Sequence, residues 1–249
     1  MPMSRRQRAF TLVELLVVVS IISLLLSMLV PTLQRARVLT VRAVCATRVK
    51  AILSGSFSYA GENRDFFPAR DGPYLPHVMY QNNPAPRPSF DLHKTFFTPY
   101  VPTPISRQIL SGTDSYVVSE AESAMFCPGP IKKVRGPEVP GWNSLSGYAY
   151  HYSTYQYLNF EPGSGRALVP EGSLPLLRHQ NAPSKYALWS CLTVDKRAAY
   201  LGHDVPEKPF LPSGMTGGFI NGSVGWIEWA YCEPYWNDGG QDFWWPMPR

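Results

Sequence analysis

Charge is scarce in this sequence. Charged residues make up 16% of the 249 positions, against about 25% in an average soluble domain. The net charge of +5 arises near the N-terminus, because the first fifty residues hold eight Arg or Lys and one acid, Glu14. Basic residues that flank an apolar segment are typical of membrane topology. We therefore expect no nucleic-acid partner, although basic chains often have one.

Signatures of catalysis and cofactor binding are also missing. The chain has no H-E-x-x-H, no G-x-S-x-G and no Walker-type loop, and its five histidines are scattered. It also has no C-x-x-C pair, the usual signature of zinc and thioredoxin-like sites. We therefore predict that the protein is not an enzyme and that it takes no cofactor and no small-molecule substrate.

The sequence does have one long apolar run, at residues 10–33. As a helix, this run is about 36 Å long, enough to cross a hydrocarbon layer of about 30 Å. The basic residues 1–9 predict a cytoplasmic N-terminus and an extracytoplasmic C-terminal domain. A cleaved secretory signal explains the run less well, because its apolar region spans only about 7–15 residues. Glu14 is unusual here, since it stands four residues inside the run.

The helix is predicted to continue over residues 34–61. Apolar or small residues recur there at spacings of three and four, which places them on one helical face. Pro31 lies between the two halves and should loosen or kink the helix, because it lacks a backbone N–H. The predicted stripe comprises Val38, Val41, Cys45, Val49, Ile52, Ser56 and Tyr59.

Residues 62–249 read as a β-rich domain, so the expected fold class is α+β, with an antiparallel sheet and long loops. Residues 62–115 are expected to form loops with one short helix or strand. Strand patterns occur at 116–118, 148–152 and 186–192, the last one buried on both faces. Asn221-Gly222 predicts a hairpin with a type I′ turn, and residues 236–249 are expected to form an ordered loop.

Four cysteines, Cys45, Cys127, Cys191 and Cys232, are candidates for a disulfide, because an extracytoplasmic domain meets oxidising conditions. Four cysteines allow three complete pairings, and the sequence does not choose among them. Cys45 and Cys191 could instead be free thiols in the core. No metal site is predicted; the acidic turn near the C-terminus offers Asp238 and Asp242 as weak candidates for calcium ligands.

The N-terminal segment "RAFTLVELL" resembles the signal of type IV pilins and of the pseudopilins of type II secretion systems. The resemblance implies that a prepilin peptidase cuts between Ala9 and Phe10 and methylates the new amino group. Glu14 then becomes the fifth residue and Pro31 the twenty-second, both of which match positions of that family. The residue before the cut is usually Gly, where this chain has Ala9.

Further stretches are similar to large bacterial prepilin-like proteins. These stretches are residues 44–69, Cys127-Pro128 and the hairpin at 219–226. The chain departs from that family at two positions, because Asn221 replaces the usual Asp and Leu211 stands where the family has a His. The resemblance implies a leader at 1–9, a membrane and assembly helix at 10–33, an amphipathic helix at 34–61 and an extracytoplasmic domain at 62–249.

The function implied is that of a structural subunit of a type IV pilus or type II secretion pseudopilus in the inner membrane. Its expected partners are the prepilin peptidase, other pilin or pseudopilin subunits and the membrane. Glu14 is expected to attract the Phe10 amine of a neighbouring subunit. The alternative is a single-pass, membrane-anchored binding protein that uses its aromatic C-terminal region for a carbohydrate or a partner protein.

Overall fold

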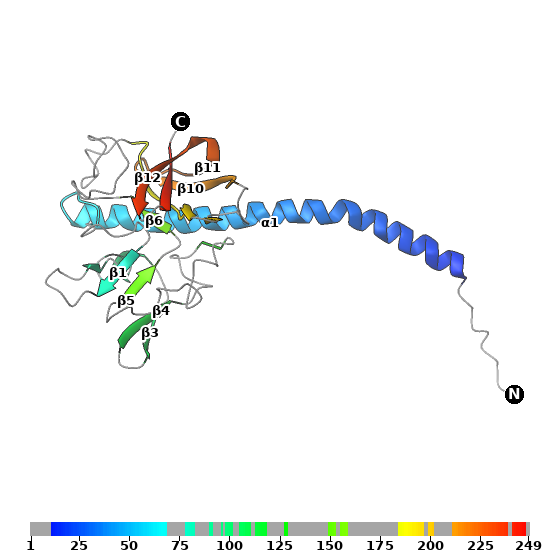
Figure 1. Ribbon diagram of the computed structural model, residues 1–249, viewed down its shortest axis with the longest axis horizontal. Helices are drawn as coiled ribbons and strands as arrows, with labels where there is room; N and C mark the ends of the chain where they lie inside the picture. The colour runs from blue at the N-terminus through cyan, green and yellow to red at the C-terminus, as the bar shows by residue number, and fades with distance from the viewer. Residues whose placement is uncertain are drawn as a thin grey trace. The chain divides into compact units, whose positions relative to one another are not determined.

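The structure is a computed structural model, and it describes residues 11–68, 78–82, 90–91, 96, 98–101, 105–110, 113–118, 127–128, 149–152, 155–158, 184–196, 199–201, 211–238 and 241–247. The chain divides into two compact units, Met1–Val41 and Arg42–Arg249. One long helix supplies most of the first unit and continues into the second (Figure 1). The α+β class predicted from the sequence is confirmed.

Helix α1 runs from Leu12 to Glu62, close to the predicted limits. In its second half the buried face comprises Cys45, Val49, Ile52, Leu53, Gly55, Ser56 and Ala60. This face contains the centre of the predicted stripe, while Val41 and Tyr59 at its edges are half-buried. Val38, at the start of the stripe, is 42% exposed. The amphipathic pattern thus marks the part of the helix that packs on the domain.

The described strands form four antiparallel sheets, in the orders β2-β1-β5, β11-β10-β7-β6, β12-β13-β8-β9 and β3-β4. A three-residue helix, α2 (Thr98–Tyr100), precedes β3. The strand bounds are β1 Val78–Asn82, β2 Phe90–Asp91, β3 Ile105–Leu110, β4 Thr113–Val118, β5 Ala149–Tyr152, β6 Tyr155–Tyr157, β7 Ala187–Cys191, β8 Val194–Lys196, β9 Ala199–Leu201, β10 Gly214–Phe219, β11 Val224–Glu228, β12 Cys232–Asp238 and β13 Gln241–Pro246.

The core lies between α1 and the β11-β10-β7-β6 sheet. Trp189 of β7 is fully buried, and its indole Nε1 donates a hydrogen bond to Ser56 Oγ of α1 at 2.9 Å. Its ring stacks on Tyr157 of β6, with 4.4 Å between centroids, and on Phe96 at 5.9 Å. Aromatic pairs at such distances add stability beyond their buried area. Trp189 therefore links the helix to the sheet.

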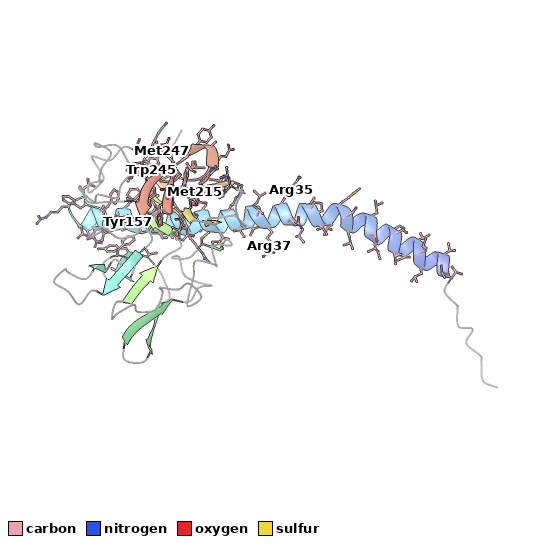
Figure 2. The ribbon with its side chains drawn as sticks, viewed as in Figure 1. Arg35, Arg37, Tyr157, Met215, Trp245 and Met247 are labelled. Atoms are coloured by element: carbon pink, nitrogen blue, oxygen red, sulfur yellow. The ribbon has the colours of Figure 1, made fainter. Side chains whose placement is uncertain are left out.

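The other face of β7 and β10 is covered by the C-terminal hairpin. A second apolar cluster joins Ala187 and Phe219 to Tyr235, Phe243 and Trp245, and Figure 2 shows the labelled Trp245 and Met247 on the same side of the domain. Because both faces of these strands are covered, every residue of β7 and β10 is buried. The prediction for residues 186–192 is thus confirmed.

A buried glutamine ties the two sheets together. Gln156 of β6 donates through Nε2 to Ser190 Oγ at 2.7 Å and to the Trp244 carbonyl. Its Oε1 accepts a hydrogen bond from the Tyr235 hydroxyl at 3.1 Å. A buried amide is costly unless its hydrogen bonds are satisfied, and here both ends of the amide have partners.

Three local predictions are corrected by the structure. Residues 62–115 hold more strand than expected, namely β1, β2, β3 and the start of β4. The tail after residue 236 is no loop, because β12 and β13 pair with each other and β13 pairs with β8. The tail is rich in aromatic residues, which favour strands, although they occur in consecutive runs and show no alternation.

The third correction concerns the β10–β11 turn. A type I′ turn needs positive φ at two central residues, but only Gly222 has it, at φ 82°. The Gly222 amide donates to the Phe219 carbonyl at 2.8 Å, and the Asn221 side chain accepts from the Ser223 amide at 2.9 Å. This pattern is that of a three-residue loop ending in a left-handed glycine. Lys50 Nζ of α1 donates to the Gly222 carbonyl at 2.6 Å, which holds the loop against the helix.

Gly218 of β10 allows α1 to approach the sheet closely, and this predicts a stability effect. A Cβ on Gly218 would lie 2.7 Å from Val49 Cγ1 of the helix. We expect Gly218→Ala to lower the free energy of unfolding by about 1–3 kcal/mol through overpacking. Gly225→Ala on the paired strand β11 is the matched control, because its Cβ would meet nothing within 4 Å. Equal denaturation midpoints of the two variants in detergent would contradict this account.

Candidate assembly site and cysteine cluster

The first half of α1 is apolar on all sides. Its large apolar residues from Leu12 to Leu33 are between 46% and 78% exposed. Within the described residues, α1 is the one helix long and apolar enough to cross a membrane, with a mean hydropathy of 2.7 over eighteen residues. A helix that is hydrophobic all round needs lipid or other helices around it. The helix therefore fits a membrane anchor.

The hydroxyl groups of this half are bonded within the helix itself. Ser20, Ser23 and Ser27 each donate to a carbonyl three or four residues earlier, all at 2.7 Å. Thr32 donates to the Leu29 carbonyl at 2.8 Å. In hydrocarbon no water can satisfy a polar group, so this internal bonding makes the hydroxyls compatible with lipid. The bond from Thr32 to Leu29 spans Pro31, which lies inside the continuous helix.

Arginines follow the apolar half. Figure 2 shows the labelled Arg35 and Arg37 on opposite sides of α1, and the helix axis changes direction on the N-terminal side of Arg35. Pro31 lies inside α1 and has no N–H to contribute to the ladder of backbone hydrogen bonds. Loosening of the helix at Pro31 stays a prediction. The arginines mark the end of the apolar half of the helix.

Glu14 forms a capping box with Thr11 at the start of α1. Its Oε2 accepts hydrogen bonds from the Thr11 amide at 2.9 Å and from the Thr11 hydroxyl at 2.7 Å. In return, the Glu14 amide donates to Thr11 Oγ1 at 3.3 Å. This is the reciprocal Thr-x-x-Glu arrangement that satisfies free N–H groups at a helix start. The sequence held this signal, but the membrane interpretation of the segment overlooked it.

The capping box gives Glu14 a defined orientation. Its carboxylate is turned back toward the helix N-terminus, where the helix dipole favours negative charge. Only Oε2 bonds to Thr11, and Oε1 makes no hydrogen bond to the described residues. The predicted cleavage residues Ala9 and Phe10 lie outside the described residues. The carboxylate thus keeps one oxygen available at the end of the helix where a new amino group would form.

Three of the four cysteines converge in the core of the second unit. Cys45 Sγ lies 2.9 Å from Cys191 Sγ and 3.5 Å from Cys127 Sγ, and all three side chains are fully buried. The Tyr155 hydroxyl lies 3.6 Å from Cys45 Sγ. The three thiols form the only group of three or more potential metal ligands among the described residues. Spacing along the sequence does not predict this cluster, because the cysteines come from distant segments of the chain.

The remaining candidates lie apart from this cluster. Cys232 bonds to the Glu228 carbonyl at 3.5 Å, and burial raises the pKa of its thiol to about 12. Asp242 of β13 lies opposite Asn237, and it joins no group of three potential metal ligands in the part of the chain that the structure describes. The side chain of Asp238 lies outside that part. Calcium ligation by the two aspartates stays a prediction.

The comparisons with known proteins bear on the N-terminus. Residues 4–30 match the family model described as the prokaryotic N-terminal methylation motif. The match spans Ala9, Phe10 and Glu14 and ends just before Pro31. Comparison with curated proteins and with solved structures gives no match.

The matched segment is a type IV pilin-like prepilin signal. Together with the candidate membrane helix, it gives the chain the N-terminus of a pilin-like or pseudopilin-like precursor. The motif is that of proteins processed and methylated at the N-terminus, as the sequence comparison with "RAFTLVELL" predicted.

Proposed function

We propose that this protein is a structural subunit of a type IV pilus or a type II secretion pseudopilus, without enzymatic activity. A prepilin peptidase removes residues 1–9 and methylates Phe10. The chain spans the inner membrane once, with a cytoplasmic N-terminus and residues 62–249 on the extracytoplasmic side. The methylation motif over residues 4–30, which includes most of the exposed apolar half of α1, is the observation that carries this proposal.

The apolar half of α1 supports assembly because it is exposed on all sides. Its side chains can be buried by lipid before assembly and by the same helix of other subunits afterwards. Because its serine and threonine hydroxyl groups are bonded within the helix, this half can lie either in lipid or against other helices. Subunits then reside in the membrane until they enter a filament.

Glu14 supports the selection of a partner. Removal of residues 1–9 leaves a positive amine on Phe10 and removes three arginines, Arg5, Arg6 and Arg8, that would hold the segment at the cytoplasmic face. The Glu14 Oε1 of one subunit accepts the Phe10 amine of its neighbour, while Oε2 keeps the bonds to Thr11. A charge pair in a medium of low dielectric is strong when hydrogen bonds hold both partners. The pair therefore sets the axial register of neighbouring helices.

The cut after Ala9 tests this proposal. We expect mass spectrometry of the protein from membranes to find N-methyl-Phe10 as the first residue. The Ala9→Gly variant should be processed at least as completely, because glycine is the smallest residue that the peptidase pocket can meet. Ala9→Leu should remain uncut, since its side chain would clash in a pocket that accepts glycine or alanine. An intact Met1 terminus in the unmodified protein would overturn the proposal and favour a membrane-anchored binding protein.

A further inference from the structure

The three-cysteine cluster of Cys45, Cys127 and Cys191 has no place in the assembly mechanism described above. It lies in the packed core, on three different parts of the chain. Cys45 comes from α1, Cys191 is the last residue of β7, and Cys127 lies outside the helices and strands. The contact between Cys45 and Cys191 therefore lies between α1 and the β11-β10-β7-β6 sheet.

The distances distinguish the two contacts of Cys45. Its Sγ is 2.9 Å from Cys191 Sγ and 3.5 Å from Cys127 Sγ. The shorter separation brings Cys45 and Cys191 within about 1 Å of the S–S bond length of about 2.05 Å. Side-chain adjustment of that size lies within the reach of two cysteine side chains. The Cys127 thiol is left as a neighbour of the pair.

The surroundings disfavour a charged cluster. The cysteines pack with apolar and aromatic residues of the core that contains Val49, Trp189 and Met215. Burial raises the pKa of the Cys191 thiol and of the Tyr155 hydroxyl well above their ordinary values. A metal ion bound by three thiolates would require each thiol to lose its proton in this environment. A disulfide is neutral and needs no such charge.

We propose that Cys45 and Cys191 form one disulfide that fastens α1 to β7, while Cys127 remains a buried thiol beside it. This inference rests on the extracytoplasmic location given under the proposed function, because disulfides form and persist in oxidising compartments.

The reaction balances as a thiol–disulfide exchange with a protein disulfide of an extracytoplasmic oxidase. One cysteine thiolate attacks that disulfide, forms a mixed disulfide and releases one oxidase thiolate. The second cysteine thiolate then attacks the mixed disulfide at the chain's own sulfur and releases the other oxidase thiolate. The two cysteines lose two protons and two electrons, and the oxidase takes up both. Since the sulfurs are fully buried in the fold, the exchange takes place before α1 docks on the sheet.

Peptide mapping tests the pairing directly. Full-length protein is extracted from membranes into detergent without reductant, and free thiols are blocked with maleimide during unfolding. Trypsin, which cuts after Lys and Arg, then places each cysteine on its own peptide, with Cys45 on 43–48 and Cys191 on 186–196. We expect a linked pair of these two peptides and maleimide on Cys127 and Cys232 only. Four labelled cysteines, or a link from Cys45 to Cys127, would overturn the proposal.

Two further measurements, of bound metal and of the N-terminal residue, separate the possible outcomes. One contrary result is a purified protein that carries one equivalent of zinc or copper and has all three thiols labelled after the metal is removed. That result would show a metal site and would overturn the disulfide. The peptide map also reports the N-terminus. A processed Phe10 terminus without the linked peptides contradicts the disulfide alone, whereas linked peptides with an intact Met1 contradict the proposed function alone.

A stability measurement adds a matched control. The disulfide would close a loop between positions 146 residues apart, and a loop of this size raises stability mainly by restricting the unfolded chain. The Cys45→Ala/Cys191→Ala double variant should lower the melting temperature by roughly 10 °C under non-reducing conditions. Cys232→Ala should lower it much less, because Cys232 lies outside the cluster. Under reducing conditions the deficit of the double variant relative to the unmodified protein should shrink, and a deficit that stays unchanged would contradict the disulfide.

Discussion

A Glu14→Gln variant is expected to enter the membrane normally and to disappear from filaments, with incorporation lower by more than about a hundredfold. Loss of one partner from a buried charge pair costs about 3–5 kcal/mol, which corresponds to a factor of this size. Glutamine keeps the shape of the side chain but cannot attract the Phe10 amine through a full charge. The measurement is the amount of the variant in a sheared-filament fraction, relative to the amount in the membrane. Glu14→Ala should behave in the same way.

The capping box provides the control for this experiment. Glutamine at this position can still complete the reciprocal arrangement with Thr11, so Glu14→Gln removes the charge but keeps the cap. Thr11→Ala does the reverse, since it removes the hydroxyl and keeps the carboxylate. We therefore expect Thr11→Ala to assemble. If Thr11→Ala fails to assemble and Glu14→Gln assembles, Glu14 acts by starting the helix and not by attracting a neighbour.

The Trp189→Ala variant is expected to lose about 3–5 kcal/mol of folding free energy, the range for removal of a fully buried large aromatic residue. A typical domain has only about 5–15 kcal/mol in total. The change leaves a cavity against Tyr157 and Phe96 and removes the hydrogen bond to Ser56. We expect the variant to be degraded in cells and to unfold at much lower denaturant concentration in detergent.

Two substitutions separate the contributions at this site. Ser56→Ala removes only the partner of the indole and should cost about 1–3 kcal/mol, because a buried donor is left without a bond. Trp226→Ala on β11 is the control for loss of a tryptophan, since Trp226 is only partly buried and packs under the Arg42 guanidinium at 3.8 Å. A Trp226→Ala variant as unstable as Trp189→Ala would contradict the central role of Trp189.

Periodicity predicted the parts of this fold that local sequence determines. The limits of α1, the buried stripe around Val49 and the doubly buried strand β7 each follow from spacing or from a continuous apolar run. The β12–β13 hairpin was taken for a loop because Asn237, Asp238 and the glycines after them suggest a turn. Asn237 and Asp238 are instead the last residues of β12, and the hairpin is extended by the pairing of β13 with β8, which spacing alone does not show.

The features of the candidate sites also differ in whether local spacing predicts them. The Thr11–Glu14 box lies within four residues, so its Thr-x-x-Glu spacing is visible in the sequence. The cysteine cluster could not have been found by spacing, because Cys45 and Cys191 are 146 residues apart and are brought together by the approach of a helix to a sheet. Contacts between distant segments arise from the whole topology, and a single sequence does not display them.

The bonded hydroxyls of Ser20, Ser23, Ser27 and Thr32 have a mechanical consequence. Because each hydroxyl is already committed to its own helix, neighbouring helices in a filament would meet there through apolar contacts without strong directional preference. Such contacts would allow small sliding and rotation at little energetic penalty, while the proposed pair at Glu14 would resist axial displacement. A filament built in this way would be fixed at one end of each helix and compliant along the rest. It could then stretch under tension and recover its length when the tension is released.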